Sequence, residues 1–172
     1  MLPDFPIEQL LRRRDTRFQL GFANQAKHEV PPGEGFELRP TRMGLQVLGR
    51  NEESLAPPVR VLRETYGEAL EVGPPRVRII EGVRAQEPVM DVKISLDPRH
   101  VALVKRALEK RDALLVEESA GSPDVVLRYE APLVALLGLA DELATLTDGT
   151  SRHTSVLSYY RLVTGGPGGS AA

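Results

Sequence analysis

Apolar and polar residues alternate most regularly in the second half of the chain. Over residues 89–96, every second side chain is apolar and most of the intervening ones are polar, which predicts a strand with one buried face. The Asp97-Pro98 pair that follows is typical of a helix N-terminus, where aspartate caps the helix and proline fits its first turn. Apolar residues then recur at helical spacing, so we expect a helix that ends near Lys110.

The rest of this half repeats the alternation of strands and helices. Residues 113–118 and 124–130 predict two short strands joined by a turn. Pro132 begins a second helical pattern that ends near Gly149, and residues 154–163 predict a closing strand. The order is strand, helix, strand, strand, helix, strand, which is the split βαβ or ferredoxin-like arrangement. We expect a four-stranded antiparallel sheet with both helices on one face.

The first half shows a less regular pattern. Residues 6–14 predict a short helix, and residues 18–30 and 36–49 predict two strands around a turn rich in proline and glycine. Residues 55–66 carry one apolar helix face, and residues 71–80 return as a strand. This order lacks the first, central strand of the ferredoxin-like arrangement. The predicted fold class is therefore α+β, with two ferredoxin-like (split βαβ) domains, the first incomplete, antiparallel sheets and helices on one face.

A short polar connector at residues 82–86 marks the predicted domain boundary. We assign residues 1–86 to the incomplete first domain and residues 87–163 to the complete second domain. Residues 164–172 contain no large apolar side chain that could join a core. This last segment therefore predicts a disordered tail.

The composition narrows the possible chemistry. The 172 residues contain no Cys, so a disulfide, a thiolate metal site and a thiol nucleophile are excluded. No apolar run approaches the ~20 residues that span a bilayer, and no secretory signal pattern is present, so we expect a cytoplasmic protein with no membrane partner. The net charge of −2 argues against a nucleic-acid backbone as the main ligand. Most cations are arginine, which suits a structured RNA partner or simply reflects codon usage.

Two stretches of the chain resemble translation elongation factor G. Residues 87–92, Glu-Pro-Val-Met-Asp-Val, look like the entry strand of its fifth domain. The run from Ala131 to Gly149 is similar to that domain's second helix, and Tyr160 falls at a tyrosine of its last strand. Residues 49–81 resemble the second half of the factor's third domain. The resemblance implies two ferredoxin-like domains and a role in translation, and related translational GTPases and ribosomal protection proteins share it.

Other signatures of that family are absent from the sequence. It contains no Gly-x-x-x-x-Gly-Lys-[Ser/Thr] phosphate loop and no Asn-Lys-x-Asp guanine-recognition motif. Only residues 82–86 lie where the family's fourth domain is inserted. We therefore expect neither GTP hydrolysis nor translocation. The function that the resemblance still implies is binding, to the ribosome or ribosomal RNA, to a translation factor or to another protein.

The resemblance also implies two binding loops. Intact factors are thought to turn an Arg-Arg-Gly turn and a Gln-Gly-Arg-Gly-Ser loop toward ribosomal RNA. The first reads Arg111-Asp112-Ala113 here, and the second corresponds to residues 148–152. We expect both loops at one end of the second sheet, with exposed arginines that contact phosphate. The candidate binding residues are Lys110, Arg111, Gly149, Thr150, Ser151 and Arg152.

No residue pattern indicates catalysis, a cofactor or a metal. The three histidines, His28, His100 and His153, share no spacing typical of metal ligands. Asp148, Ser151 and His153 have the residue types of a catalytic triad, but a triad is defined by its geometry in space rather than by proximity in sequence. We predict no enzyme activity, no catalytic residues, no cofactor, no metal and no small-molecule substrate.

Two functional hypotheses remain. The first is a non-catalytic, elongation-factor-G-like binding module that docks on the ribosome or on a translation factor, which the presence of both resembling segments favours. The second is a protein–protein interaction scaffold that kept the fold but not ribosome binding, which the replaced arginines of the two loops favour. A cluster of cations in the first half is either a surface for RNA or an acidic partner, or a solvated helix end. Its members are Arg12, Arg13, Arg14 and Arg17.

Overall fold

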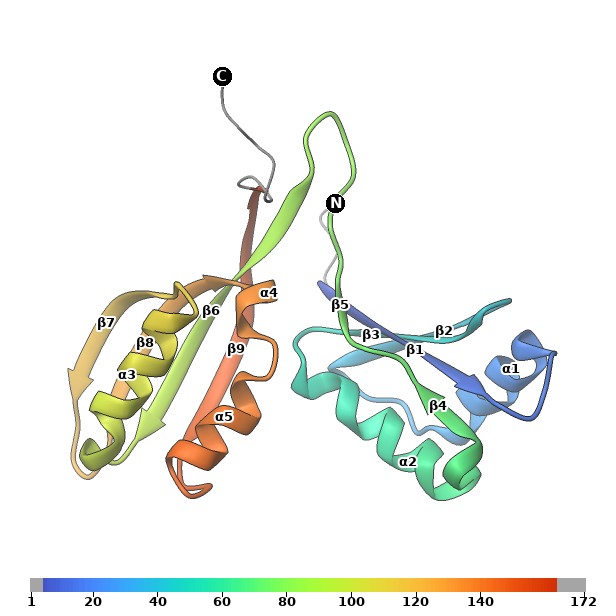
Figure 1. The fold of residues 1–172 in the computed structure, drawn as a ribbon, viewed down its shortest axis with the longest axis horizontal. Coiled ribbons are helices and arrows are strands. Elements are labelled where there is room, and N and C mark those ends of the chain that lie inside the picture. Colours follow the sequence, from blue (N-terminus) through green and yellow to red (C-terminus); the bar gives the residue numbers. More distant parts are fainter. Residues whose placement is uncertain (1–4, 164–172) are drawn as a thin grey trace. The chain divides into compact units, whose positions relative to one another are not determined.

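The computed structural model describes residues 5–163, which fall into two compact units that divide between Arg78 and Ile79 (Figure 1). The predicted tail, residues 164–172, lies outside the described residues. Ile80 and Gln86 pair across a short loop that leads into the second unit. The independent folding of residues 87–163 stays a prediction.

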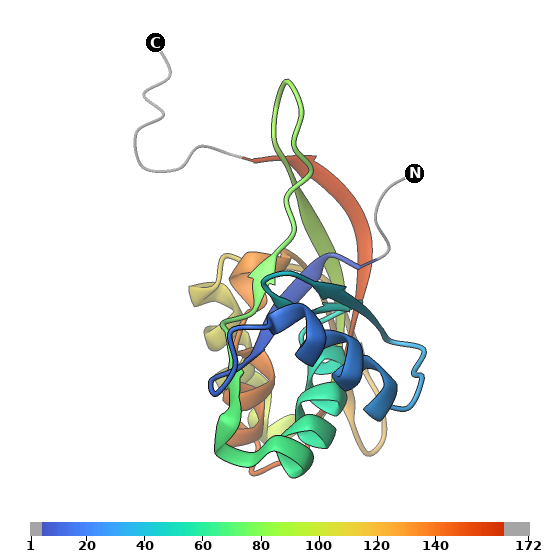
Figure 2. The ribbon, with the colours of Figure 1, turned by 90° about the vertical axis from the view of Figure 1, so that its right-hand side faces the viewer.

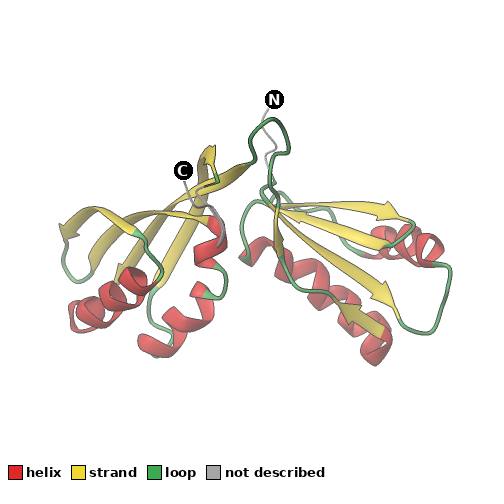
Figure 3. Cartoon of the chain, turned by 45° about the horizontal axis from the view of Figure 1, so that its top comes forward, coloured by secondary structure: helices red, strands yellow, loops and turns green. Residues whose placement is uncertain are grey.

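The first unit is a complete βαββαβ arrangement with one additional short strand. Its strands are ordered β2-β3-β1-β4, β5 also pairs with β1, and every pairing is antiparallel. Both helices lie on the same face of the sheet (Figure 3). The elements are β1 (Ile7–Arg13), α1 (Gln19–Glu29), β2 (Phe36–Thr41), β3 (Gly44–Gly49), α2 (Ala56–Tyr66), β4 (Leu70–Val72) and β5 (Arg76–Val77), with single 3₁₀ turns at Glu53–Leu55 and Gly67–Ala69.

The central strand that the sequence analysis expected to be missing is present as β1. The prediction of a helix at residues 6–14 was wrong. The spacing of Ile7 and Leu11 explains the error. A separation of four residues places two side chains on one face of either a helix or a strand. Both side chains are fully buried, in a strand that pairs with β3 on one side and β4 on the other.

Three further expectations for this unit were wrong. Residues 71–80 contain two short strands, β4 and β5, which pair with different parts of β1, rather than one strand. Residues 18–30 form helix α1 rather than a strand, and its buried residues Phe22, Ala23 and Ala26 recur at helical spacing. Residues 36–49 form a hairpin of two strands rather than one strand. The helix over residues 55–66 is confirmed, and it ends at Gly67, whose φ is 56°.

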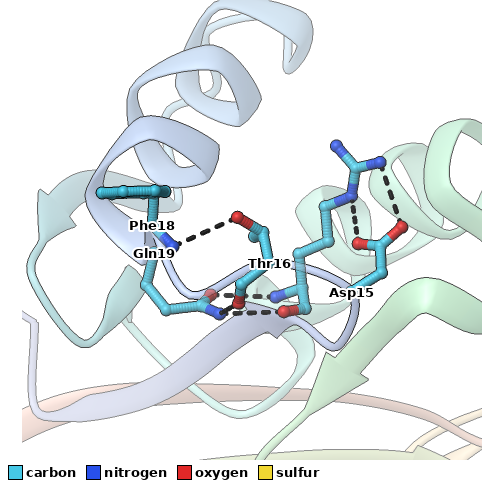
Figure 4. A network of polar contacts seen from close by, with 5 residues as sticks. Asp15, Thr16, Phe18 and Gln19 are labelled. Carbon is cyan, nitrogen blue, oxygen red and sulfur yellow. Dashed lines mark hydrogen bonds and ion pairs between the residues drawn. The ribbon is translucent and has the colours of Figure 1, made fainter.

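The start of α1 is held by polar contacts rather than by a capping side chain. Gln19 is buried, its Oε1 accepts from the Arg13 backbone amide (3.0 Å), and its Nε2 donates to the Arg13 and Thr16 carbonyls (both 2.8 Å). The Phe18 amide donates to Thr16 Oγ1 (Figure 4). This network satisfies backbone groups that the end of a strand and the start of a helix leave without partners.

The second unit confirms the predicted order of strands and helices. Its strands are ordered β7-β8-β6-β9 and all pair antiparallel, which is the same topology as in the first unit. The long strands β6 and β9 form a curved pair (Figure 2) with a bulge at Val89 and Met90. The elements are β6 (Gln86–Leu96), α3 (Val101–Lys110), β7 (Leu114–Ala120), β8 (Val125–Pro132), α4 (Leu133–Leu136), α5 (Leu139–Leu146) and β9 (Arg152–Leu162), with a 3₁₀ turn at Pro98–His100.

The second helix of this unit is broken where one continuous helix was expected. Helix α4 ends at Leu136, and Gly138 has a φ of 80°, a left-handed conformation that favours glycine. The capping role of Asp97 is confirmed, because its carboxylate accepts from the Arg99 amide at 2.8 Å. That hydrogen bond lowers the pKa of Asp97.

The core of the second unit lies between the helices and one face of the sheet. Alternate side chains of β6 and β8 point from that face toward the helices and are buried, as the alternation in the sequence predicted. The opposite face of the sheet carries the polar members of the same strands. Fully or almost fully buried core residues include Met90, Val92, Ile94, Leu96, Val104, Leu108, Leu127, Tyr129, Leu136 and Leu143. Within residues 5–163, no helix has the length and apolar character needed to cross a membrane.

Candidate binding surface

The two candidate loops lie at opposite ends of the second sheet. Strand β7 begins at Leu114, opposite Glu130 near the end of β8, whereas β9 begins at Arg152, opposite Ser95 near the end of β6. Since β7 runs parallel to β6 and β9 runs antiparallel to it, the loops that precede β7 and β9 are separated by the length of the sheet (Figure 1). The expectation that both loops share one end was wrong. Antiparallel topology, which a motif match does not contain, decides this point.

Arg111 is committed to the interior of the unit rather than exposed as expected. Its guanidinium donates to the carbonyls of Ala135 and Leu137, each at 2.9 Å, and pairs with Glu142 at 2.7 Å. Only 19% of the side chain is exposed. These contacts satisfy carbonyls at the break between α4 and α5, so the side chain supports that break and has little capacity left for phosphate.

The remaining residues of the first loop form a tight helix end. Lys110 is exposed at the last position of α3. The Asp112 amide donates to Glu109 and the Ala113 amide to Leu108, with Asp112 at a φ of 56°. Lys110 and Arg111 were both predicted to bind through this loop, but of the two only Lys110 presents its charge to solvent.

The second loop is fixed by a hydroxyl network around Thr147. Thr147 is fully buried, and its Oγ1 donates to the Leu143 carbonyl at 2.7 Å. The same oxygen accepts from the Ser151 amide at 3.2 Å and lies 2.9 Å from Ser151 Oγ. Thr150 Oγ1 donates to the Thr147 carbonyl, and the Gly149 amide, at a φ of 74°, donates to Ala144. The loop is thus rigid, and the hydroxyl of Ser151 is engaged structurally.

Arg152 is the exposed cation of the second loop, and it belongs to a wider polar surface. It starts β9 opposite Ser95, next to the Lys93–Thr154 pair of the same sheet face. Across β6 and β8, Lys93 lies directly opposite Arg128. We call Lys93, Arg128 and Arg152 the cationic end of the open face. The alternation along residues 89–96 predicted the polar face of β6, but no local signal connects that face with the other strands, because cross-strand register is a tertiary property.

Arg128 is held by two acids on the same face. It pairs with Asp91 at 2.9 Å and with Glu117 at 3.3 Å, and the hydrogen bond and charge of Asp91, with a contribution from Glu117, raise the pKa of the guanidinium. A hollow of about 260 Å³ lies on this part of the sheet. It is lined by Lys93, Glu117, Ser119, Val126 and Arg128.

The arginine cluster of the first unit is divided by the strand that carries it. Arg13 pairs with Asp15 at 2.6 Å (Figure 4), and its guanidinium lies 5.3 Å from the centre of the Tyr66 ring. Arg12 faces a different environment and lines a separate hollow of about 480 Å³. Arg14 and Arg17 are exposed. The four cations therefore do not form one surface.

Several candidate side chains are engaged in contacts within the second unit. Among the described residues, no group of three or more His, Asp or Glu is placed to hold a metal ion. Ser151 contacts Thr147, and Glu117 contacts Arg128. Exposed side chains of the second unit include cations and hydroxyls, which are groups that contact phosphate or carboxylate.

Comparison with known proteins gives one family and a set of related factors. Residues 84–168 match the family described as elongation factor G C-terminus. The large ribosomal subunit assembly factor BipA of Salmonella typhimurium is 34% identical over 118 residues, which are 67% of this chain and 19% of that protein. BipA of Haemophilus influenzae is 33% identical over 137 residues, 76% of this chain and 21% of that protein.

Elongation factor G itself is also similar. The protein from Granulibacter bethesdensis is 27% identical over 79 residues, 46% of this chain and 11% of that factor. The chain thus spans about a fifth of the length of the BipA relatives it matches. The ferredoxin-like order of the second unit and the resemblance of its strand and helix motifs agree with the match. Through residues 84–168, the chain belongs to the elongation factor G C-terminus family.

Proposed function

We propose that this protein is a non-catalytic binding module of the translation machinery, which docks on the ribosome or on a translation factor. The observation that carries the proposal is the family match over residues 84–168, on a unit that has the complete ferredoxin-like topology. Similarity to proteins named as a ribosomal subunit assembly factor and an elongation factor supports a ribosomal setting. Such a role places the protein in the cytoplasm, where ribosomes are found.

The proposal of a non-catalytic role rests on the family region that the chain matches and on its sequence motifs. The family region is the C-terminus of elongation factor G, and the 172 residues contain no phosphate-loop motif. The structured loop around Thr147 supports the same view, because its hydroxyls are engaged with each other and with backbone groups.

The proposed contact surface is the end of the second sheet where β9 begins. Gly149, Thr150, Ser151 and Arg152 lie there, with the backbone fixed and the arginine exposed. Arg111 is not part of this surface, since it is bonded to Ala135, Leu137 and Glu142. Lys110 is exposed at the other end of the sheet and is the less favoured contact.

The test is co-sedimentation of the purified full chain with ribosomes through a sucrose cushion. We expect binding that weakens as salt is raised, because phosphate contacts release counterions. The matched control is the same protein centrifuged without ribosomes. If the protein stays in the supernatant with ribosomes at low salt, the ribosomal proposal fails.

The alternative proposal is a protein-interaction scaffold, which one observation favours. Every residue of β7 is exposed, including Leu114, Leu115 and Val116 (64%, 39% and 55%). Among the described strands, β7 pairs with β8 alone, so its outer edge presents backbone groups that an added strand can pair with. The scaffold is supported if the wild type does not sediment with ribosomes but binds an added extended peptide, and if Val116→Lys abolishes that peptide binding.

A further inference from the structure

We propose that the cationic end of the open face binds the phosphate backbone of RNA, and that this sheet face is the principal RNA contact. This inference deepens the proposed function and rests on it for the source of the RNA. It differs from the loop contact that the family resemblance implied, because two of its three cations lie within strands β6 and β8.

Positive and negative side chains are separated along the open face. The register places Lys93, Arg128 and Arg152 toward one end, with Ser95 and Thr154 as cross-strand neighbours. One acid, Glu117, also lies there, directly opposite Arg128, so cations outnumber acids at this end. Toward the other end, Asp91 lies directly opposite Glu130. A surface whose net charge is locally positive attracts anions even in a protein whose total charge is −2.

Two like charges face each other across β6 and β8. Lys93 and Arg128 occupy directly opposite positions, an arrangement that destabilises a sheet unless the charge is compensated. Asp91 and Glu117 compensate Arg128. Within residues 5–163, no acid forms an ion pair with Lys93 or with Arg152, so a bound anion would supply the compensation that the fold does not.

The shape of the surface also suits a bound anion. The hollow of about 260 Å³ between Lys93 and Arg128 is smaller than typical small-molecule pockets of about 300–1,000 Å³, yet it suits a single phosphate group. Ser119 lines it and adds a hydroxyl, a common phosphate contact. Glu117 lines it as well, and the charge of this carboxylate is compensated by its ion pair with Arg128.

The open-face positions of β6 and β8 carry no aromatic ring on which a base could stack. On β9, Tyr159 is partly exposed, but its hydroxyl donates to Glu130 at the acidic end of the face, away from the three cations. We therefore expect contact with the backbone and weak dependence on base sequence.

The experiment compares two matched double variants of the full chain. Lys93→Glu with Arg152→Glu removes the two exposed cations of the cationic end. Arg106→Glu with Arg84→Glu makes the same change of charge at two exposed positions away from it, in helix α3 and before β6. A fluorescein-labelled RNA hairpin is titrated with each protein, and binding is followed by anisotropy at several salt concentrations.

We expect the first variant to bind the hairpin at least tenfold more weakly than the wild type. The slope of log affinity against log salt should become shallower by about 0.7–0.9 for each phosphate that the variant no longer neutralises. The control variant should stay within threefold of the wild type. Thermal unfolding of each variant checks the fold, and Lys93→Gln with Arg152→Gln provides a milder pair should the glutamates unfold the sheet.

Three results would overturn the inference. Equal weakening by both variants would mean a response to total charge, and an unchanged affinity of the first variant would place the contact elsewhere. Binding of polyglutamate but not of RNA would identify an acidic protein partner. Ribosome sedimentation distinguishes the two proposals. If the first variant sediments with ribosomes like the wild type, the proposed function is retained. If the wild type binds the hairpin but does not sediment with ribosomes, only the ribosomal setting is rejected.

Discussion

Arg111 shows how the chemical type of a side chain leaves its role undecided. An arginine in a loop suits a phosphate contact, yet this one bridges two carbonyls and a glutamate at a break between helices. The planar guanidinium presents several donors in a fixed fork, which fits such a cluster of acceptors. The same chemistry that makes arginine a phosphate ligand therefore makes it a structural clamp here.

Replacing Arg111 by Ala should lower the free energy of unfolding by about 1.5–3 kcal/mol, because partly buried carbonyls and Glu142 lose a charged donor. Urea denaturation measures the change. The neighbouring Lys110→Ala is the control, and we expect it to stay within about 0.5 kcal/mol of the wild type, since Lys110 is exposed. Equal effects of the two substitutions would contradict the structural role of Arg111.

Tyr66 gives a prediction for alkaline pH. Burial, with the nearby Glu29 carboxylate, raises the pKa of Tyr66 to about 12 from its ordinary value of 10.0. The unfolded chain therefore loses this phenol proton first, and the free energy of unfolding should fall as pH rises from about 10 to about 12. Denaturation across this range should show a smaller fall for Tyr66→Phe than for the wild type. Identical curves would mean that the tyrosine titrates normally.

In the hairpin of β2 and β3, the close approach of β3 to β1 restricts which residue can occupy position 44. Gly44 has a φ of 143°, and a Cβ at this position would lie 2.3 Å from the Leu11 carbonyl oxygen of β1. The turn residues are further ordered by Thr41, whose Oγ1 donates to the Gly44 carbonyl at 2.8 Å. The close approach of β3 to β1 thus requires glycine.

Gly44→Ala should destabilise the first unit by about 3 kcal/mol or more, because backbone strain adds to the clash with Leu11. Gly67→Ala is the matched control, since its φ is also positive, at 56°, but nothing lies within 4 Å of the added Cβ. We expect about 1–2 kcal/mol for that change. Thermal unfolding of both variants decides between strain alone and strain with steric overlap.

The two units repeat one topology, and this bears on how the chain folds. Each has its own buried core and its own sheet of antiparallel strands. A unit of this kind can fold alone when its local patterns and its packing agree. In the second unit, local sequence patterns and packing agree except at the break between α4 and α5.

A fragment of residues 87–163 should unfold in one cooperative thermal transition, followed by circular dichroism. A longer fragment that begins at Ile79 is the control, because it restores the Ile80–Gln86 pairing. We expect the longer fragment to be equally or more stable. Absence of a cooperative transition in both would show that the second unit depends on the first.

The full chain should bind neither GTP nor GDP, since its sequence offers no phosphate loop. Isothermal titration calorimetry of each nucleotide with magnesium present measures this directly. The outcome that would refute the expectation is a dissociation constant in the micromolar range. Such a result would also reopen the proposal of a non-catalytic role.

The sequence by itself determined the second unit closely. Strict alternation in β6, the Asp97 cap and the glycines that end helices are local signals, and each acts over a few residues. The motifs at residues 87–92 and in the second helix also indicated the family that the comparison confirmed. In the first unit the local signals were ambiguous, because Ile7 and Leu11 satisfy helix and strand periods equally.

Only the tertiary structure decided which side chains meet. Pairing with β3 and β4 makes residues 7–13 a strand, because burial on the sheet satisfies both its backbone groups and its apolar face. The opposite directions of β7 and β9 separate the two candidate loops, and cross-strand register brings Lys93, Arg128 and Arg152 onto one face. These are long-range relations, and a single sequence carries no local signal for them.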